Sequence, residues 1–401
     1  MHQLSPTTSG RWRVGLTVGL VVLLLLPFNS TEAEAWEDET NILCESVPSL
    51  AFNGSLANRS VQWQVDLGPR IPGSNASLAF REHLQTTLEP LGWNYTETVH
   101  QRHGMNLTNV EARWNGTVHG TGQVVLSAHY DSRNIADWDS NESNRSLPVP
   151  GANDGASGAA VLMELARHIP NLGLAHDVVL FWNDAEDQNE NFTAGAEAWA
   201  ENLSTEDIAS THAFVLLDMV GDADLQLRNI NPGNDTLKQR IVELAAALGM
   251  IEDRLDCNGT LGLDIVQYNI EVGVLDDHYH AHVRNIPSID VMDPVYGEPK
   301  WGTFGTFWHT MQDTPDKVSA ESLGMVGRLI ELGLRTDAFV NITNQTHVSE
   351  VNDSNQRQNE HPTVASKKNI LAFDSLIPLF SLAAGAAQTT LRRKNNDSHA
   401  R

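Results

Sequence analysis

Short apolar runs alternate with longer segments of helical periodicity along the chain, and this alternation most constrains the fold. The strand-like runs cover residues 124–128, 177–182, 213–217 and 286–291. The helical segments cover residues 77–91, 155–168, 194–203, 237–248 and 320–339. Buried parallel strands read as continuous apolar runs, and each parallel connection needs a crossover, usually a helix. We therefore expect a single α/β domain with a central mixed, mostly parallel sheet and helices on both of its faces.

The composition changes near both ends of the 401-residue chain. Arg11 and Arg13 precede the apolar run Val14–Phe28, and Ala33-Glu34-Ala35 offers a cleavage motif. This pattern is typical of a secretory signal peptide, with an uncleaved anchor as the alternative. The boundaries that we expect are a signal peptide at 1–35, a catalytic domain at 36–341, a polar linker at 342–369 and a weakly apolar tail with a basic end at 370–401. Such a tail could associate with a membrane.

The charge and the glycosylation motifs bear on partners and location. There are 51 acidic against 26 basic residues, for a formal net charge of -25. A surface of this kind repels phosphates, which argues against nucleic-acid binding. Asn-x-Ser/Thr sequons are frequent, for example at Asn53, Asn58 and Asn75. Together with the signal peptide they predict a secreted or cell-surface glycoprotein. The oligomeric state does not follow from the sequence.

Cys44 and Cys257 are the only cysteines. In an oxidising compartment they could pair and tie the N-terminal region to the body of the protein, and two unpaired buried thiols are the alternative. Neither cysteine has neighbours suited to metal binding. A metal site in this chain would therefore use histidine and carboxylate ligands.

Such residues stand where the expected strands end. They are His129 and Asp131 after the first strand, Asp154 at the start of the next helix, Glu186 and Asp187 after the second strand, Asp218 after the third strand, and His309 before the last helix. Open α/β sheets bind ligands at the carboxyl ends of their strands, so we expect these side chains to converge. Imidazole and carboxylate together suit zinc. The ordered set predicts a zinc site.

The adjacent carboxylates Glu186 and Asp187 can divide the work of metal-assisted hydrolysis. Asp187 can hold the metal while Glu186 serves as the general base. Asp131 would support catalysis by fixing the tautomer of His129 through the second ring nitrogen. Each residue alone has an ordinary explanation, such as a helix N-cap for Asp154. Only the joint pattern indicates a metal site.

The motifs resemble those of the zinc aminopeptidase family that includes secreted bacterial and yeast enzymes, and of its relatives, the glutaminyl cyclases. The resemblance covers about Gln62 to Phe339 and implies a zinc-exopeptidase-like fold. The matching motifs are His-Tyr-Asp-Ser at 129–132, Asn-Asp-Gly-Ala-Ser-Gly at 153–158, Glu-Asp at 186–187, Leu-Asp-Met-Val-Gly at 217–221 and Trp-His-Thr at 308–310.

The aminopeptidase pattern implies two zinc ions with Asp154 as the bridging ligand. His129, Asp154 and Asp218 would hold one ion, and Asp154, Asp187 and His309 the other. In this pattern Glu186 is the general base. The chain departs from the family at two positions, with Asp187 where Glu is frequent and Ala185 where Gly is usual.

Other motifs look like those of animal glutaminyl cyclases. They are Gly-Pro-Arg-x-Pro-Gly-Ser at 68–74, Asp-Asp-His at 276–278 and Trp-His-Thr-Met at 308–311. This resemblance implies a single zinc on Asp154, Asp187 and His309, with Glu186 as a proton shuttle. Asp218 and Asp276 would support it through a carboxylate network, and Trp308 would lie near the substrate.

Three hypotheses follow. The first is an exported zinc-dependent aminopeptidase that acts on the N-termini of peptides or proteins. The second is a glutaminyl-peptide cyclotransferase. The third is a non-catalytic ectodomain of the same fold, against which the complete ligand set argues.

One further pattern stands apart from these motifs. His278, His280 and His282 alternate, so on a strand they would form an extra metal site. A loop or the start of a helix is the favoured interpretation.

Overall fold

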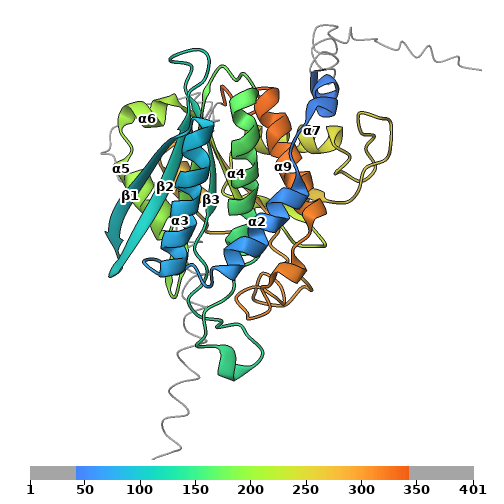
Figure 1. Ribbon diagram of the computed structural model, residues 1–401. Helices are drawn as coiled ribbons and strands as arrows, with labels where there is room; N and C mark the ends of the chain where they lie inside the picture. Colours follow the sequence, from blue (N-terminus) through green and yellow to red (C-terminus); the bar gives the residue numbers. More distant parts are fainter. Residues whose placement is uncertain (1–41, 343–401) are drawn as a thin grey trace, which may run out of the picture. The chain divides into compact units, whose positions relative to one another are not determined.

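A computed structural model describes residues 42–342 (Figure 1). The expected signal peptide, the expected tail and all but the first residue of the expected linker lie outside the described residues, and they stay predictions. Within residues 42–342, no helix is long and apolar enough to cross a membrane.

A six-stranded sheet with the order β1-β2-β4-β3-β7-β10 forms the centre of the fold. Its strands are β1 (Asn94–Arg102), β2 (Met105–Trp114), β3 (Gln123–His129), β4 (Asp177–Asn183), β7 (Thr211–Asp218) and β10 (Ser288–Met292). Four neighbouring strands of this sheet, β4, β3, β7 and β10, are parallel to one another. β1 and β2 form an antiparallel hairpin at one edge, where β2 also pairs antiparallel with β4. The predicted mixed, mostly parallel sheet is confirmed.

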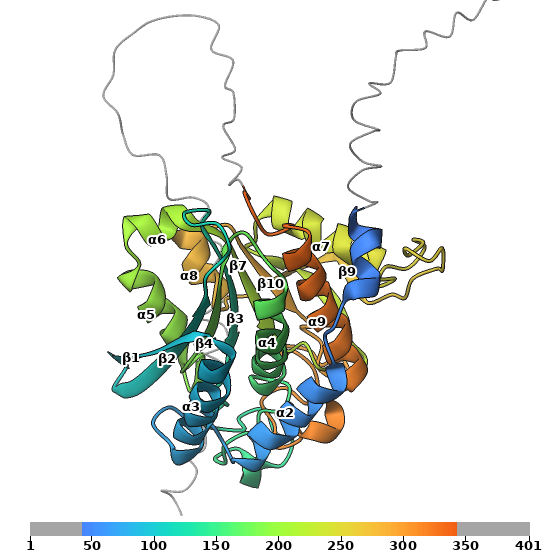
Figure 2. The same cartoon turned by 45° about the horizontal axis from the view of Figure 1, so that its top comes forward.

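Helices cover both faces of this sheet. They are α2 (Gly54–Asp66), α3 (Asn75–Leu88), α4 (Ala156–His168), α5 (Ala194–Asn202), α6 (Thr205–Ser210), α7 (Asp235–Ala247), α8 (His278–Val283) and α9 (Ala320–Arg335). Figure 2 shows α5, α6 and α8 on one side of the sheet and α2, α4 and α9 on the other. The predicted helical covering of both faces is confirmed.

Two separate apolar cores lie against the two faces of the sheet. On β3, Val124 and Leu126 belong to the larger core under α2, α3, α4 and α9, whereas Val125 belongs to the smaller core under α5. On β4, Trp182 faces the larger core and Phe181 the smaller one. Successive strand residues point to opposite faces, so a strand buried on both sides must be apolar throughout. This is why the central strands could be recognised from continuous apolar runs.

Besides the short antiparallel pair of β5 (Asp187–Gln188) and β6 (Asn191–Phe192), two strand pairs were not expected from the sequence. The first is the β1–β2 hairpin, and the second is the parallel pair β8 (Leu227–Asn231) and β9 (Val266–Gly273). β1 lies at the sheet edge and is mostly exposed, so its sequence is polar and has no apolar run. Pairing with β2, rather than its own side chains, holds this strand in the sheet.

The last helix ends four residues earlier than expected, at Arg335 instead of Phe339. Asp337 adopts a left-handed conformation with φ 52°, which a continuing helix does not allow. Phe339 then folds back onto the helix, where a β-carbon at Gly333 would lie 2.3 Å from its ring. The apolar residues after residue 335 are therefore buried because the turn packs back onto the helix, and not because the helix continues.

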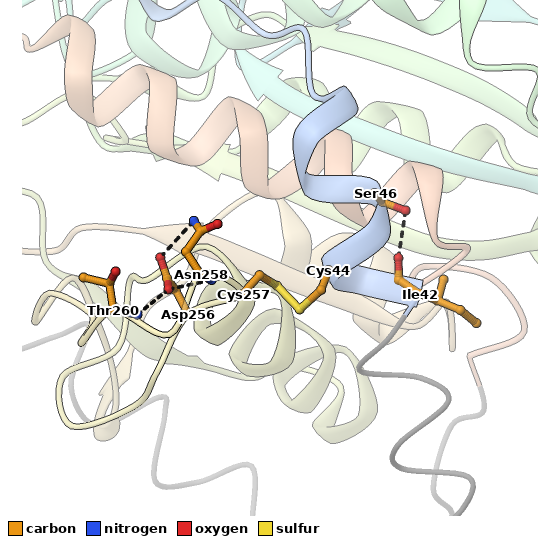
Figure 3. The surroundings of a disulfide bond; sticks show 7 residues. All are labelled: Ile42, Cys44, Ser46, Asp256, Cys257, Asn258 and Thr260. Carbon is orange, nitrogen blue, oxygen red and sulfur yellow. Dashed lines mark hydrogen bonds between the residues drawn. A yellow bond between two sulfur atoms is a disulfide. The ribbon is translucent and has the colours of Figure 1, made fainter.

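Cys44 and Cys257 form a disulfide (Figure 3). It joins the N-terminal helical residues 42–46 to the loop that follows α7 and links positions 213 residues apart. The paired alternative therefore holds, and the described residues include no free cysteine. Such a long closed loop restricts the unfolded chain strongly, which stabilises the folded state.

We expect the double replacement Cys44→Ser and Cys257→Ser to lower the free energy of unfolding by about 2–5 kcal/mol, because the unfolded chain regains its freedom. Urea unfolding of the variant and of the parent protein measures this difference. Reduced parent protein is the control and should match the double variant. An unchanged unfolding midpoint would show that the disulfide does not contribute to stability.

Candidate zinc site

The site lies at the carboxyl ends of the central parallel strands. His129 is the last residue of β3, and Asp218 is the last residue of the neighbouring strand β7. On the other side of β3, His129 pairs with Asn183, the last residue of β4, and the chain then leads directly to Glu186 and Asp187. Strand register thus brings three segments of the predicted site to one edge of the sheet.

The five predicted ligands form two groups that share Asp154. In the first group, His129 Nε2 lies 3.3 Å from Asp154 Oδ1 and 3.2 Å from Asp218 Oδ1. In the second, His309 Nε2 lies 2.9 Å from Asp187 Oδ2 and 3.5 Å from Asp154 Oδ2. Within each group the ligand atoms lie within 4.8 Å of one another, and all five residues are buried. Each group can therefore hold one metal ion.

The second group has the stronger requirement for a cation. Asp187 Oδ2 is buried and accepts no hydrogen bond, although His309 Nε2 is close to it. An unpaired buried carboxylate oxygen is costly unless a cation binds it. In the first group, by contrast, Asp218 Oδ1 is already hydrogen-bonded to His129 Nε2. The donors around Asp187 thus fit zinc, which accepts nitrogen and carboxylate oxygen ligands.

Asp154 does not cap a helix, contrary to its ordinary interpretation. α4 begins at Ala156, and its N-cap is Gly155, which has φ 102°. A side chain could not fit there, because a β-carbon would lie 2.3 Å from Asp131 O. The carboxylate of Asp154 is therefore left to face the two histidines.

Asp131 holds several parts of the site in place. Its carboxylate accepts hydrogen bonds from the backbone N–H of Glu186 at 3.0 Å, from that of Asp187 at 3.1 Å and from Gln188 Nε2 at 2.8 Å. Its Oδ1 also lies 3.4 Å from His129 Nδ1. The structure thus places Asp131 where it can orient His129, as expected, and adds a second task, which is to fix the backbone of the acidic pair.

Glu186 is half-buried and lies among other carboxyl groups. Burial, and then the charge of Asp187, raises the pKa of Glu186 well above its usual range. Burial and the charge of Asp218 likewise raise the pKa of Asp276. A carboxyl group with a raised pKa accepts a proton more readily than an ordinary one and can return it to a leaving group. This environment suits the proton-transfer role predicted for Glu186.

Trp308 and the three alternating histidines have different positions. The ring of Trp308 stacks on that of His309, with centroids 3.4 Å apart. His278, His280 and His282 lie on or beside the short helix α8, where His278 Nε2 faces Pro232 O and His280 Nε2 faces Thr193 Oγ1. Among residues 42–342, no metal-binding group includes these histidines. The favoured interpretation as the start of a helix agrees with the structure.

Two charged residues of the site were missed. Arg133 forms a salt bridge with Asp187 and another, at 2.9 Å, with Asp137. Asp137 Oδ1 in turn lies 3.6 Å from His309 Nδ1. Arg133 and Asp137 therefore link the two ligands Asp187 and His309 through a chain of charged contacts. They lie in a loop. A spacing of four residues indicates a contact within a helix but not within a loop, so the sequence could not identify this pair.

Asp313 was missed as well. It accepts hydrogen bonds from the backbone N–H of Asn153 at 2.8 Å and of Asp154 at 3.2 Å. Tyr296 donates a further hydrogen bond of 2.8 Å to the same carboxylate. Burial, together with the charge of Asp154, raises the pKa of Asp313 to about 7. Asp313 thus fixes the loop that carries the shared ligand.

The backbone around the site adopts a conformation that side chains disfavour. Ala185, Met219 and His309 have φ of 61°, 46° and 54°. A left-handed conformation costs a non-glycine residue about 1–2 kcal/mol. This explains why glycine is usual in the resembling family at the position of Ala185. The turns that present Glu186 and His309 are held by the surrounding structure, not by local preference.

Comparison with protein families gives one match. The model of peptidase family M28 matches residues 109–332, which include all five predicted ligands as well as Asp131, Glu186, Asp276 and Trp308. Zinc as the metal agrees with this match, whereas the number of ions is not decided by it.

Comparisons with individual proteins give more distant similarities. Aminopeptidase YwaD of Bacillus subtilis is 22% identical over 212 residues, which are 52% of this chain but only 39% of that protein. The glutaminyl cyclase of Porphyromonas gingivalis is 27% identical, with a TM-score of 0.60, over 70% of this chain and 96% of that one. A leucine aminopeptidase precursor of Bacteroides thetaiotaomicron, 24% identical, has a TM-score of 0.61 over 71% of this chain and 98% of that one, and shows the shared fold.

We expect Asp137→Ala to weaken zinc binding by at least about tenfold, because His309 loses the carboxylate that orients it. Competition with a chelating dye measures the dissociation constant. Asp177→Ala is a matched control, because Asp177 also pairs with an arginine, Arg113, but at the opposite end of β4. Equal zinc affinity in both variants would contradict a role of Asp137 at the metal.

Proposed function

The chain belongs to peptidase family M28, and on that premise we propose that it is a zinc enzyme that converts an N-terminal glutamine of peptides into pyroglutamate. A zinc peptidase-like function follows from the family and from its relatives. The choice of cyclisation over hydrolysis is the proposed part. The sequence favours the aminopeptidase first and the glutaminyl cyclase second, and this proposal reverses that order.

The observation that carries the proposal is the difference between the two ligand groups. Asp187 Oδ2 in the second group lacks a hydrogen-bond partner, whereas His129 in the first group is hydrogen-bonded. One zinc on Asp154, Asp187 and His309 is therefore the arrangement that the geometry favours.

The sequence identity to a solved glutaminyl cyclase also supports cyclisation. The Porphyromonas gingivalis cyclase is 27% identical over 96% of its chain. The alignment with aminopeptidase YwaD takes in 39% of that protein. The leucine aminopeptidase precursor is matched over 98% of its chain at 24% identity, so the difference between the two activities lies in the identity and not in the extent of the match.

The residues of the site fit the chemistry of cyclisation. The substrate α-amine attacks the γ-amide carbon, a C–N bond forms, and the bond to the amide nitrogen breaks to release ammonia. Glu186 takes the proton from the amine and gives it to the departing nitrogen, a task that its raised pKa suits. Zinc, when bound, polarises the γ-carbonyl oxygen. Trp308, stacked on His309, shields this side of the site from water, which would otherwise hydrolyse the amide.

Aminopeptidase activity is the second candidate. It is favoured by the complete first group, since His129 and Asp218 lie within ligand distance of the shared Asp154. Two ions bridged by a carboxylate activate water for peptide hydrolysis. A non-catalytic role would leave both ligand groups without a purpose.

We further propose that the protein acts outside the cytoplasm. The Cys44–Cys257 disulfide supports this location, because disulfides persist in oxidising compartments. The peptide or protein N-termini that we propose as substrates would then be those of exported chains.

We expect Glu186→Gln to lower the rate of ammonia release from a Gln-Ala-Ala-Ala peptide by a factor of about 100 or more, because the proton shuttle is lost. Zinc content should not change, since Glu186 is outside both ligand groups. Coupled ammonia detection and elemental analysis measure the two quantities. Full activity of this variant would show that another group moves the proton.

The number of metal ions separates the two candidate functions. We expect one zinc per chain in the parent protein and in His129→Ala, with ammonia released and the peptide left intact and blocked. The two-zinc aminopeptidase predicts instead two ions in the parent protein, one in the variant and free N-terminal glutamine. Elemental analysis and mass spectrometry of the products distinguish these results.

A further inference from the structure

An aromatic and basic rim lies beside the proposed zinc site. We propose that Trp138 and Lys300 form a subsite for the substrate residues that follow the N-terminal one, and that this subsite prefers an acidic side chain. The inference rests on the proposed action on peptide N-termini and adds a substrate class to it.

A continuous series of contacts leads from the ligand His309 to this rim. The ring of Trp308 stacks on His309, and the ring of Trp138 lies 6.2 Å from that of Trp308. The backbone N–H of Trp138 donates a hydrogen bond of 3.3 Å to His309 O, so the position of Trp138 is tied to the ligand. Lys300 Nζ lies 5.8 Å from the centre of the Trp138 ring. A peptide held by its N-terminus at the metal would extend over these rings.

The basic end of the series is open to solvent. Lys300 is exposed, donates a 3.4 Å hydrogen bond to Trp138 O and has no ion-pair partner within residues 42–342. The adjacent Trp301 is 98% exposed. Tryptophan is seldom so exposed unless it contacts another molecule, and it is common at peptide-binding surfaces. The rim thus offers apolar area and one unpaired positive charge.

The loop that carries Lys300 is held in a defined place. Tyr296 N–H donates a 2.7 Å hydrogen bond to Phe304 O and closes the loop at its base. Tyr296 Oη is bonded to Asp313, the residue that also fixes the loop of Asp154. The Lys300 loop and the metal site therefore share one anchor, which keeps their separation fixed.

The charges around the site indicate which substrate residue suits the rim. The interior is lined by carboxylates, which attract the positive N-terminal amine of a peptide. The protein as a whole carries a net charge of -25, which repels acidic side chains elsewhere. Glu298 lies in the same loop but is exposed, and no ion pair joins it to Lys300 within the described residues. Lys300 is thus the cation of this rim that an acidic side chain can reach.

Peptides with a charge at a single position test the proposal. The substrates are Gln-Ala-Ala-Ala and its variants with Asp or Lys at the second, third or fourth position. We expect the zinc-loaded protein to have a kcat/KM about two- to fivefold higher for Asp than for Lys at one position, the size of an exposed ion pair. Lys300→Glu should reverse this preference, mainly through KM.

Lys317→Glu is the matched control. Lys317 also lies over an aromatic ring, Phe307, at 5.3 Å, and its replacement changes the net charge by the same amount. It is paired with Asp316, so it is not available to a substrate. Lys317→Glu should keep the preference of the parent protein. Equal changes in both variants, or no preference in the parent protein, would overturn the subsite.

The reaction products keep this result separate from the proposed function. Ammonia and free glutamine are measured for each peptide, so the preference is obtained whether the enzyme cyclises or hydrolyses. Release of free glutamine with a reversed preference in Lys300→Glu would reject cyclisation and retain the subsite. Calorimetric binding of the same peptides to Glu186→Gln gives the preference without turnover, and identical affinities for Asp and Lys peptides there would reject the subsite.

Discussion

The burial of many carboxylates at one edge of the sheet is the constraint on which the site depends. Asp131, Asp154, Asp187, Asp218 and Asp276 are all nearly inaccessible to solvent. Each buried charge costs several kcal/mol unless donors or cations compensate it, and like charges repel one another. The structure compensates them with backbone N–H groups, the two histidines and Arg133. Asp187 Oδ2 accepts no hydrogen bond, although His309 Nε2 lies 2.9 Å from it, and a zinc ion between the two would complete the compensation.

The scaffold supplies the rigidity that this arrangement requires. Asp313 holds the loop of Asp154, and Asp131 holds the backbone of Glu186. Left-handed residues such as Ala185 and His309 are retained at an energetic cost, because the packed strands and loops around them fix the chain. The same anchors extend to Tyr296 and so to the rim at Lys300. Metal binding, proton transfer and the proposed peptide subsite therefore depend on one connected set of hydrogen bonds.

Whether a strand or a site residue could be predicted from the sequence depends on whether its own side chains or its neighbours specify it. β3 and β7 were recognised because both of their faces are buried, which leaves a continuous apolar run. β1 was not, because an exposed edge strand is specified by its neighbour and not by its own side chains. Among the site residues, those at strand ends could be proposed, whereas Arg133, Asp137 and Asp313 act through contacts between loops. Such contacts have no fixed spacing in the sequence.

The sequence by itself determined the order of the ligands along the chain, their chemical type and the class of fold, because apolar periodicity and residue identity are local properties. The family resemblance implied the shared role of Asp154, but only the tertiary structure decided that His129 is hydrogen-bonded while Asp187 Oδ2 is not, and that Cys44 pairs with Cys257. These facts depend on distances of a few ångströms between segments far apart in the chain. Such distances are set by packing and strand register, which no single segment encodes.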